Sequence, residues 1–126
     1  MVSSTSESIP RVITLDGLSG SGKSTLARLL ANQLGWVYLD SGAWYRALTW
    51  AALEREIDVK SAEGVLDLLF NINIDSKKDG AVLVDGAVLN KELRLPEIDM
   101  AVSSVADHLS VRGELNKQMR NILKQD

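Results

Sequence analysis

Residues Gly17–Ser24 read GLSGSGKS, which is a complete G-x-x-x-x-G-K-[ST] phosphate-binding motif. The apolar run Val12–Leu15 precedes it, and a helical pattern from Lys23 to Leu34 follows it. A strand, a glycine-rich loop and a helix in this order form the context in which the motif binds phosphate. The alternative is an ordinary Gly/Ser turn that happens to contain a lysine. The flanking segments favour the phosphate loop, so the sequence predicts binding of a nucleoside triphosphate.

The residue types in the loop suggest how it would hold phosphates. Its glycines let backbone N–H groups converge on an anion without obstruction from Cβ atoms; they are Gly17, Gly20 and Gly22. The helix that begins near Lys23 directs its positive dipole end at the same point. Lys23 is expected to reach the β and γ phosphates, and the Ser24 hydroxyl to ligate Mg²⁺. Asp16, at the tip of the preceding strand, is expected to orient a water beside the metal.

Composition excludes several classes of partner. The net charge is −3 and the pI is near 5.1, so no broad basic surface is expected for nucleic acid or an anionic membrane. The chain has no cysteine, which excludes disulfides and thiolate metal sites and fits a cytoplasmic location. No apolar run approaches the ~20 residues of a membrane span. At 126 residues, the chain is expected to form one domain or a domain with a small insert.

Periodicity predicts the remaining elements. Residues 11–16 and 36–39 are predicted strands, and Gly35 is a suitable stop for the helix between them. Ser41 is expected to cap a second helix, and Ser61 a third that runs to Phe70. Residues 72–75 and 81–85 are predicted to form a hairpin through a Lys-Asp-Gly turn, with a further short strand at 86–89. Two helices then follow, at 96–107 and 110–124.

A second motif follows the second strand. Residues 40–47 read DSGAWYRA and lie where the carboxyl edge of an α/β sheet binds ligands. Ser41 places a hydroxyl beside free helix N–H groups, and Arg46 offers a two-pronged guanidinium suited to a phosphate. Spacing alone favours the simpler interpretation, a capped helix with a surface arginine.

Other residues give weaker signals for chemistry. His108 is the only histidine and lies between apolar neighbours, so a structural role is favoured. The acidic residues of the hairpin alternate with lysines, as in a solvated turn. The tryptophans are expected in the core and not on a base-stacking surface; they are Trp36, Trp44 and Trp50.

The two motifs together resemble the opening of bacterial cytidylate (CMP/dCMP) kinases. That family reads D-G-x-S-G-[SA]-G-K-[GS]-T and then L-D-[ST]-G-A-x-Y-R, against GLSGSGKST and LDSGAWYR here. The similarity continues through VLVDGAVLNKELRLPEIDMAVSSVADHLSVRGEL and covers residues 11 to about 120. Trp44 stands where the family has a small or aliphatic residue.

The resemblance implies site residues for both substrates. The loop would hold the ATP phosphates, with Lys23 as the catalytic residue and Ser24 on Mg²⁺; its binding residues are Gly17, Ser19, Gly20, Ser21, Gly22, Lys23, Ser24 and Thr25. Ser41 and Arg46 would contact CMP, the arginine at its phosphate. Arg94 matches the arginine of the family's I-R-T-P-E-V segment. Ser103 would contact the cytosine base, and Arg112 the base or phosphate region.

The fold implied is α/β, that of a P-loop nucleoside monophosphate kinase. It has a parallel sheet with helices on both faces and a small inserted α+β substrate-binding lobe. We expect a disordered tail at 1–10, the P-loop core at 11–60, the lobe at 61–108, and a helix returning to the core at 109–126. The expected reaction is ATP-dependent phosphorylation of CMP or dCMP to CDP or dCDP. The alternatives are a non-catalytic nucleotide-binding fragment and a P-loop kinase of another small phosphate acceptor.

The family continues with a D-G-R-D-x-G-T element and an arginine-rich lid, neither of which occurs in these 126 residues. In the family's strand order, 2-3-1-4-5, a later strand separates the first two. We therefore expect an incomplete core sheet in which those two strands stay apart and leave unpaired edges. The chain alone is expected to be a poor or inactive kinase. It would be marginally stable, or would complete its sheet by self-association or by pairing with a missing C-terminal half.

Overall fold

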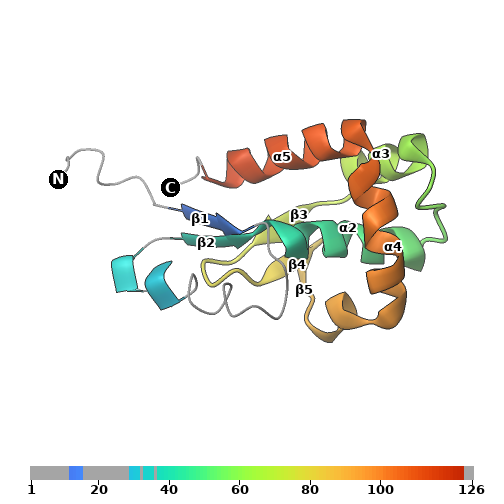
Figure 1. Ribbon diagram of the computed structural model, residues 1–126. Helices are drawn as coiled ribbons and strands as arrows, with labels where there is room; N and C mark the ends of the chain where they lie inside the picture. The colour runs from blue at the N-terminus through green and yellow to red at the C-terminus, as the bar shows by residue number, and fades with distance from the viewer. Residues whose placement is uncertain (1–11, 16–28, 32, 36, 124–126) are drawn as a thin grey trace.

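The computed structural model describes residues 12–15, 29–31, 33–35 and 37–123 (Figure 1). Residues 29–31 and 33–34 are helical, and Gly35 follows them with a φ of 71°. The predicted tail and phosphate loop, with most of the predicted first helix, lie outside the described residues. The other elements are β1 (Val12–Leu15), β2 (Val37–Asp40), α2 (Ser41–Glu54), α3 (Ala62–Asn71), β3 (Ile74–Ser76), β4 (Val82–Val84), β5 (Ala87–Val88), the 3₁₀ helix η2 (Lys91–Arg94), α4 (Pro96–Asp107) and α5 (Leu109–Leu123).

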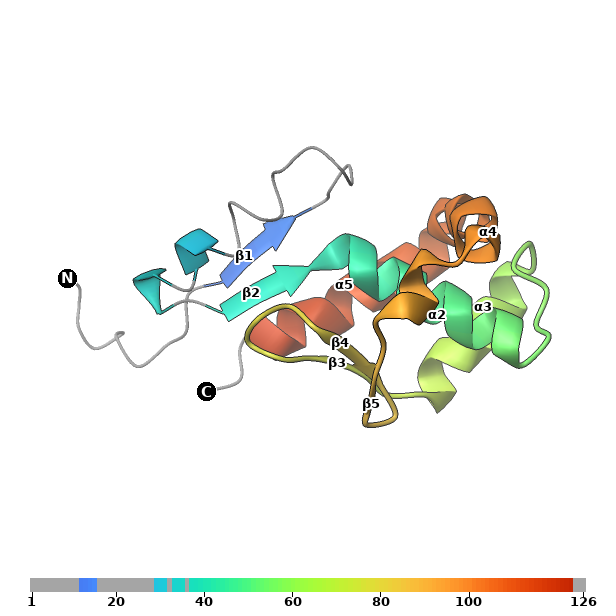
Figure 2. The same ribbon diagram turned by 90° about the horizontal axis from the view of Figure 1, so that it is seen from below.

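The strands β1 and β2 are direct neighbours. They pair in parallel, with Val12 opposite Val37 and Leu15 opposite Asp40 (Figure 2). The expectation that these strands stay apart is therefore wrong. Each strand has backbone N–H and C=O groups that need partners, and residues 16–36 are long enough to make the parallel crossover between them. The argument for instability from two facing unpaired edges no longer applies.

The hairpin turn meets the parallel pair. The Tyr38 amide of β2 donates to the Lys78 carbonyl oxygen at 2.9 Å. Gly80, with a φ of 95°, lies against the Tyr38 ring so closely that a Cβ atom at Gly80 would overlap it. A glycine is required here both for the backbone conformation and for the close approach. This turn is the point at which the two sheets of the described chain contact each other.

The second sheet has the antiparallel order β3-β4-β5, as the hairpin pattern predicted. Ile74 pairs with Val84 and Ser76 with Val82, and β5 continues the sheet on the other side of β4. The turn closes through a hydrogen bond from the Gly80 amide to the Lys77 carbonyl oxygen. The short third strand at β5 was also predicted correctly.

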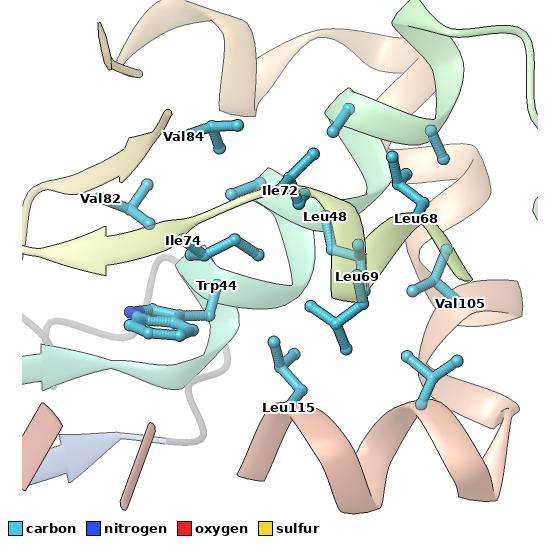
Figure 3. Packing of buried hydrophobic residues seen from close by; sticks show 14 of the residues in the cluster. Trp44, Leu48, Leu68, Leu69, Ile72, Ile74, Val82, Val84, Val105 and Leu115 are labelled. Atoms are coloured by element: carbon cyan, nitrogen blue, oxygen red, sulfur yellow. The ribbon is translucent and has the colours of Figure 1, made fainter. Parts of the chain in front are cut away.

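Helix α2 lies at the centre of the core. It packs against α4, β4 and η2, while α3 packs against α5 (Figure 1). The side chains that α2 buries include Trp44 and Leu48, both fully inaccessible (Figure 3). Burial of one such side chain contributes roughly 1.5–3 kcal/mol. The cluster also contains Leu68, Leu69, Ile74, Val82, Val84, Val105 and Leu115.

The helix caps agree with the prediction in one case and differ in the other. The Ser61 hydroxyl accepts from the Gly64 amide at 3.0 Å and caps α3, as predicted. For α2 the predicted cap, Ser41, is instead the first helical residue. Asp40 is the cap, and its carboxylate accepts from the Ala43 amide at 3.1 Å. An ionised carboxylate is as good a cap as a hydroxyl and also complements the positive end of the helix dipole.

The histidine has the structural role that its neighbours suggested. His108 lies at the junction of α4 and α5, and its Nε2 is 2.7 Å from the Val59 carbonyl oxygen in the loop between α2 and α3.

None of the helices among the described residues is long and apolar enough to span a bilayer.

Candidate acceptor site on helices α2 and α4

The predicted donor residues belong to a part of the chain that the structure does not describe. They are Asp16, Gly17, Ser19, Gly20, Ser21, Gly22, Lys23, Ser24 and Thr25. Their segment begins at the carboxyl end of β1, where Leu15 pairs with Asp40. Asp40 in turn caps α2. Leu15, the last described residue before the phosphate-loop motif, therefore lies beside the N-terminus of the helix that carries the second motif.

Ser41 is nearly buried at this N-terminus, with a relative exposure of 4%. It follows Asp40 directly, so it lies on the edge where both parallel strands end. The free N–H groups of a first helical turn and the positive dipole end favour an anion at this edge. Capping by Asp40 satisfies the Ala43 amide and places one carboxylate there already.

Arg46 joins three elements. Its Nη1 donates to the Leu93 carbonyl oxygen of η2 at 3.0 Å and to Asp99 Oδ1 of α4 at 2.6 Å. The side chain is 29% exposed, so the guanidinium is held but still reaches solvent. The family resemblance implied a guanidinium presented to a phosphate. The structure shows one that already has a carboxylate partner.

The residue after Leu93 is the predicted Arg94, at the end of η2. Its side chain is exposed and makes no ion pair with another described residue. At the start of η2, the Asn90 amide donates to Glu92 Oε1 at 2.9 Å. This hydrogen bond lowers the pKa of the Glu92 carboxyl below its ordinary value. The short helix thus places an exposed cation next to the carbonyl that holds Arg46.

Ser103 lies further along α4, and Arg112 of α5 contacts the C-terminal end of α4. Ser103 is exposed and follows Asp99 by four residues, so both are on one side of the helix. Arg112, on α5, is exposed, and its Nη1 donates to the Ala106 carbonyl oxygen at 3.3 Å. A cation at the last turn of a helix is favourable with respect to the dipole. This contact alone would account for Arg112 as a structural residue.

Helix α4 therefore connects the predicted acceptor residues. Asp99, Ser103 and Ala106 have the i, i+4, i+7 spacing of one helical face. Arg46 is bonded at the first of these positions and Arg112 at the last. Seven residues of α-helix span about 10 Å. Arg46 is thus bonded to the first turn of α4 and Arg112 to a backbone carbonyl of its last turn, with the exposed Ser103 between these positions along the helix.

Asp99 and the Leu93 carbonyl are contacts that the sequence did not indicate. They lie 53 and 47 residues from Arg46 along the chain. No motif links these positions, so only the packing of α2 against α4 reveals the contact. Among the described residues, no group of three or more His, Cys, Asp or Glu side chains is placed to hold a metal ion.

The comparisons with known proteins identify the family of the chain. The family model for cytidylate kinase matches residues 13–126. A cytidylate kinase of Oceanobacillus iheyensis is 40% identical over 113 residues, which cover 87% of this chain and 49% of the relative. Cytidylate kinases of Roseiflexus castenholzii and Enterococcus faecalis are 41% and 42% identical, over 91% and 82% of the chain. The chain spans about half the length of these relatives. On these grounds, the chain belongs to the cytidylate kinase family.

Proposed function

We propose that the protein phosphorylates CMP and dCMP with ATP, and that this chain supplies the ATP loop and the grip on the acceptor phosphate. One observation carries the proposal most directly: Leu15 of β1 pairs with Asp40, the cap of α2. This register supports a donor loop that starts beside the helix bearing Ser41 and Arg46. Two nucleotides must meet end to end for phosphoryl transfer, and adjacent donor and acceptor elements are what that requires.

On the donor side, backbone N–H groups of residues 17–25 would hold the ATP phosphates, with Lys23 at the β and γ positions. The Ser24 hydroxyl and the Asp16 carboxylate would provide the oxygen ligands that Mg²⁺ prefers, the carboxylate through a water. Bound Mg²⁺ neutralises charge on the transferring phosphoryl group. This donor set is chemically suitable for the metal.

On the acceptor side, Arg46 would hold the CMP phosphate, because its side chain is partly exposed and lies on the helix that begins where the parallel strands end. Ser41 would contribute at the same edge. Ser103 would contact the base, and Arg112 the base or the phosphate region. Ser103 lies on α4, four residues after the Asp99 partner of Arg46, and Arg112 on α5 donates to Ala106 near the end of α4. Arg94 is an exposed cation beside this face.

With both nucleotides held, an oxygen of the CMP phosphate attacks the γ-phosphorus of ATP in line with the leaving group. A new P–O bond forms to CMP, the bond between the γ-phosphorus and the bridging oxygen breaks, and ADP leaves. The protein contributes positioning and positive charge, and no covalent intermediate is needed.

We also propose residues 61–108 as the substrate-binding lobe, between a P-loop core at 11–60 and a returning helix at 109–126. The hairpin sheet β3-β4-β5 and helix α4 belong to this lobe. The buried side chains of the lobe are continuous with the buried face of α2, which belongs to the P-loop core. The lobe and the P-loop core would therefore move together at α2.

Acceptor selectivity tests the proposal. CMP, dCMP, UMP, AMP and GMP would each be titrated into the purified protein by calorimetry, and ADP release would be followed with each acceptor. We expect CMP and dCMP to bind and the purine nucleotides to bind at least tenfold more weakly. Equal binding of AMP, GMP and CMP would contradict the assignment. Selective CMP binding without any ADP release would instead support a non-catalytic nucleotide-binding module.

A further inference from the structure

The side chain that is proposed to hold the acceptor phosphate already has an anionic partner. Arg46 Nη1 carries two hydrogens, and two acceptors take them: Asp99 Oδ1 at 2.6 Å and the Leu93 carbonyl oxygen at 3.0 Å. A phosphate gripped end-on through both Nη atoms must displace one of these acceptors. A phosphate gripped through Nε and Nη2 would leave both acceptors in place but would lie close to the Asp99 carboxylate.

The ion pair between Arg46 and Asp99 contributes little to the stability of the fold. Asp99 is 59% exposed and Arg46 29%, and pairs of this kind contribute little to folding because solvent screens them. The helices α2 and α4 pack against each other and share one buried apolar cluster, to which α2 contributes Leu48 and α4 contributes Val105. The main effect of Asp99 is therefore on the Arg46 guanidinium and on its affinity for an anionic ligand, and not on the stability of the fold.

We propose that Asp99 competes with the phosphate of the acceptor nucleotide for Arg46 and so determines the affinity for nucleoside monophosphates. The inference rests on the proposed function, in which Arg46 is the phosphate ligand. In the free protein the carboxylate neutralises Arg46. In the complex it is displaced from the guanidinium or repels the bound phosphate, and both effects weaken binding of an anion.

An alternative role for Asp99 is to hold Arg46 in its binding pose, in which case loss of Asp99 would weaken CMP binding. The contact with Leu93 argues against that role, because the carbonyl oxygen anchors the same Nη1 without adding negative charge. Asparagine at position 99 retains an oxygen that can accept from Arg46 and removes only the charge. The sign of the change on substitution therefore separates competition from positioning.

The test is calorimetric titration of CMP into the purified protein and its Asp99→Asn variant. Glu97→Gln is the matched control, because Glu97 lies in the same first turn of α4, is exposed, and makes no ion pair among the described residues. Asp99→Asn is expected to lower the Kd for CMP by about three- to tenfold, as removal of one screened like charge predicts. Glu97→Gln is expected to change it less than twofold. Cytidine, which lacks the phosphate, should bind both variants like the original protein.

Substitution of Arg46 distinguishes the ways in which the idea can fail. In an Arg46→Ala background, Asp99→Asn should change the Kd for CMP by less than twofold, because the competed group is absent. If Arg46→Ala weakens CMP binding but Asp99→Asn weakens it or matches Glu97→Gln, competition is wrong while the proposed function stands. If Arg46→Ala leaves CMP binding unchanged, or if neither the original protein nor Asp99→Asn binds CMP at millimolar concentration, the acceptor-site assignment fails and this inference fails with it.

Discussion

The two parts of the described chain are organised differently. Residues 37–123 form a continuous unit in which α2, α3, α4, α5 and the hairpin sheet share one buried cluster. In the part before residue 37, β1 has its partner in β2, and the leucines of the helical segment are largely exposed; they are Leu29, Leu30 and Leu34. The candidate site residues are divided in the same way along the sequence, with the donor motif in the first part and the proposed acceptor residues in the second. The difference suggests that the acceptor unit carries most of the stability of these 126 residues.

The largest predicted effect is the difference between two leucine-to-alanine substitutions, one in each part, in the free energy of unfolding. Leu48→Ala removes a fully buried side chain from α2 and should lower the free energy of unfolding by roughly 2–5 kcal/mol. Leu34→Ala acts on a side chain that is 49% exposed and should change it by less than about 1 kcal/mol. Urea unfolding followed by circular dichroism measures both. Equal losses would show that the first part is as well packed as the second.

The contact between the hairpin turn and β2 can be tested at Gly80. Gly80→Ala combines strain at a φ of 95° with overlap on the Tyr38 ring, and should cost roughly 2–4 kcal/mol. Gly86→Ala is the matched control, because its φ is 86° but no atom lies near its Cβ position. It should cost only about 1 kcal/mol. If the two variants melt at the same temperature, the turn does not pack on Tyr38 as the structure has it.

A smaller effect is expected at the cap where the two parts meet. Asp40→Ala removes the acceptor for the Ala43 amide and should destabilise the protein by about 1 kcal/mol. Asp40→Asn keeps an oxygen acceptor at the same position and should lose only a few tenths of a kcal/mol. Thermal unfolding compares the two variants. Equal losses in the two variants would mean that the charge of Asp40, and not its capping bond, is what matters, because both substitutions remove the charge and only asparagine keeps the acceptor.

The sequence was sufficient for most elements and insufficient for two contacts between them. The apolar spacing on α2 and the turn at residues 76–80 are local signals, and both predicted the observed elements. The residues of β1 and β2 do not specify which strand each one pairs with, so the sequence did not predict that β1 and β2 pair with each other. The family's strand order predicted the wrong neighbour because it places a later strand between the first two, and the described residues contain no such strand.

The candidate site shows the same limit. The resemblance of the second motif to the family predicted Ser41 and Arg46 as acceptor residues, because the motif is a local stretch of sequence. The Asp99 carboxylate on Arg46 depends on the packing of α2 against α4 and has no sequence signal. Ser41 was assigned as the cap of α2, and Asp40 holds that position because two adjacent capping residues compete for one helix start.

The division into a donor part and an acceptor part is tested most directly by crossing two ligands with two variants. ATP and CMP would each be titrated by calorimetry into Lys23→Ala and Arg46→Ala, with melting curves to confirm that both variants fold. Lys23→Ala should lose most of its ATP affinity and keep its CMP affinity. Arg46→Ala should lose about 1.5–3 kcal/mol of CMP binding, the value of a charge-assisted pair, and keep its ATP affinity. Loss of both ligands in either variant, or unchanged binding in both, would contradict the account.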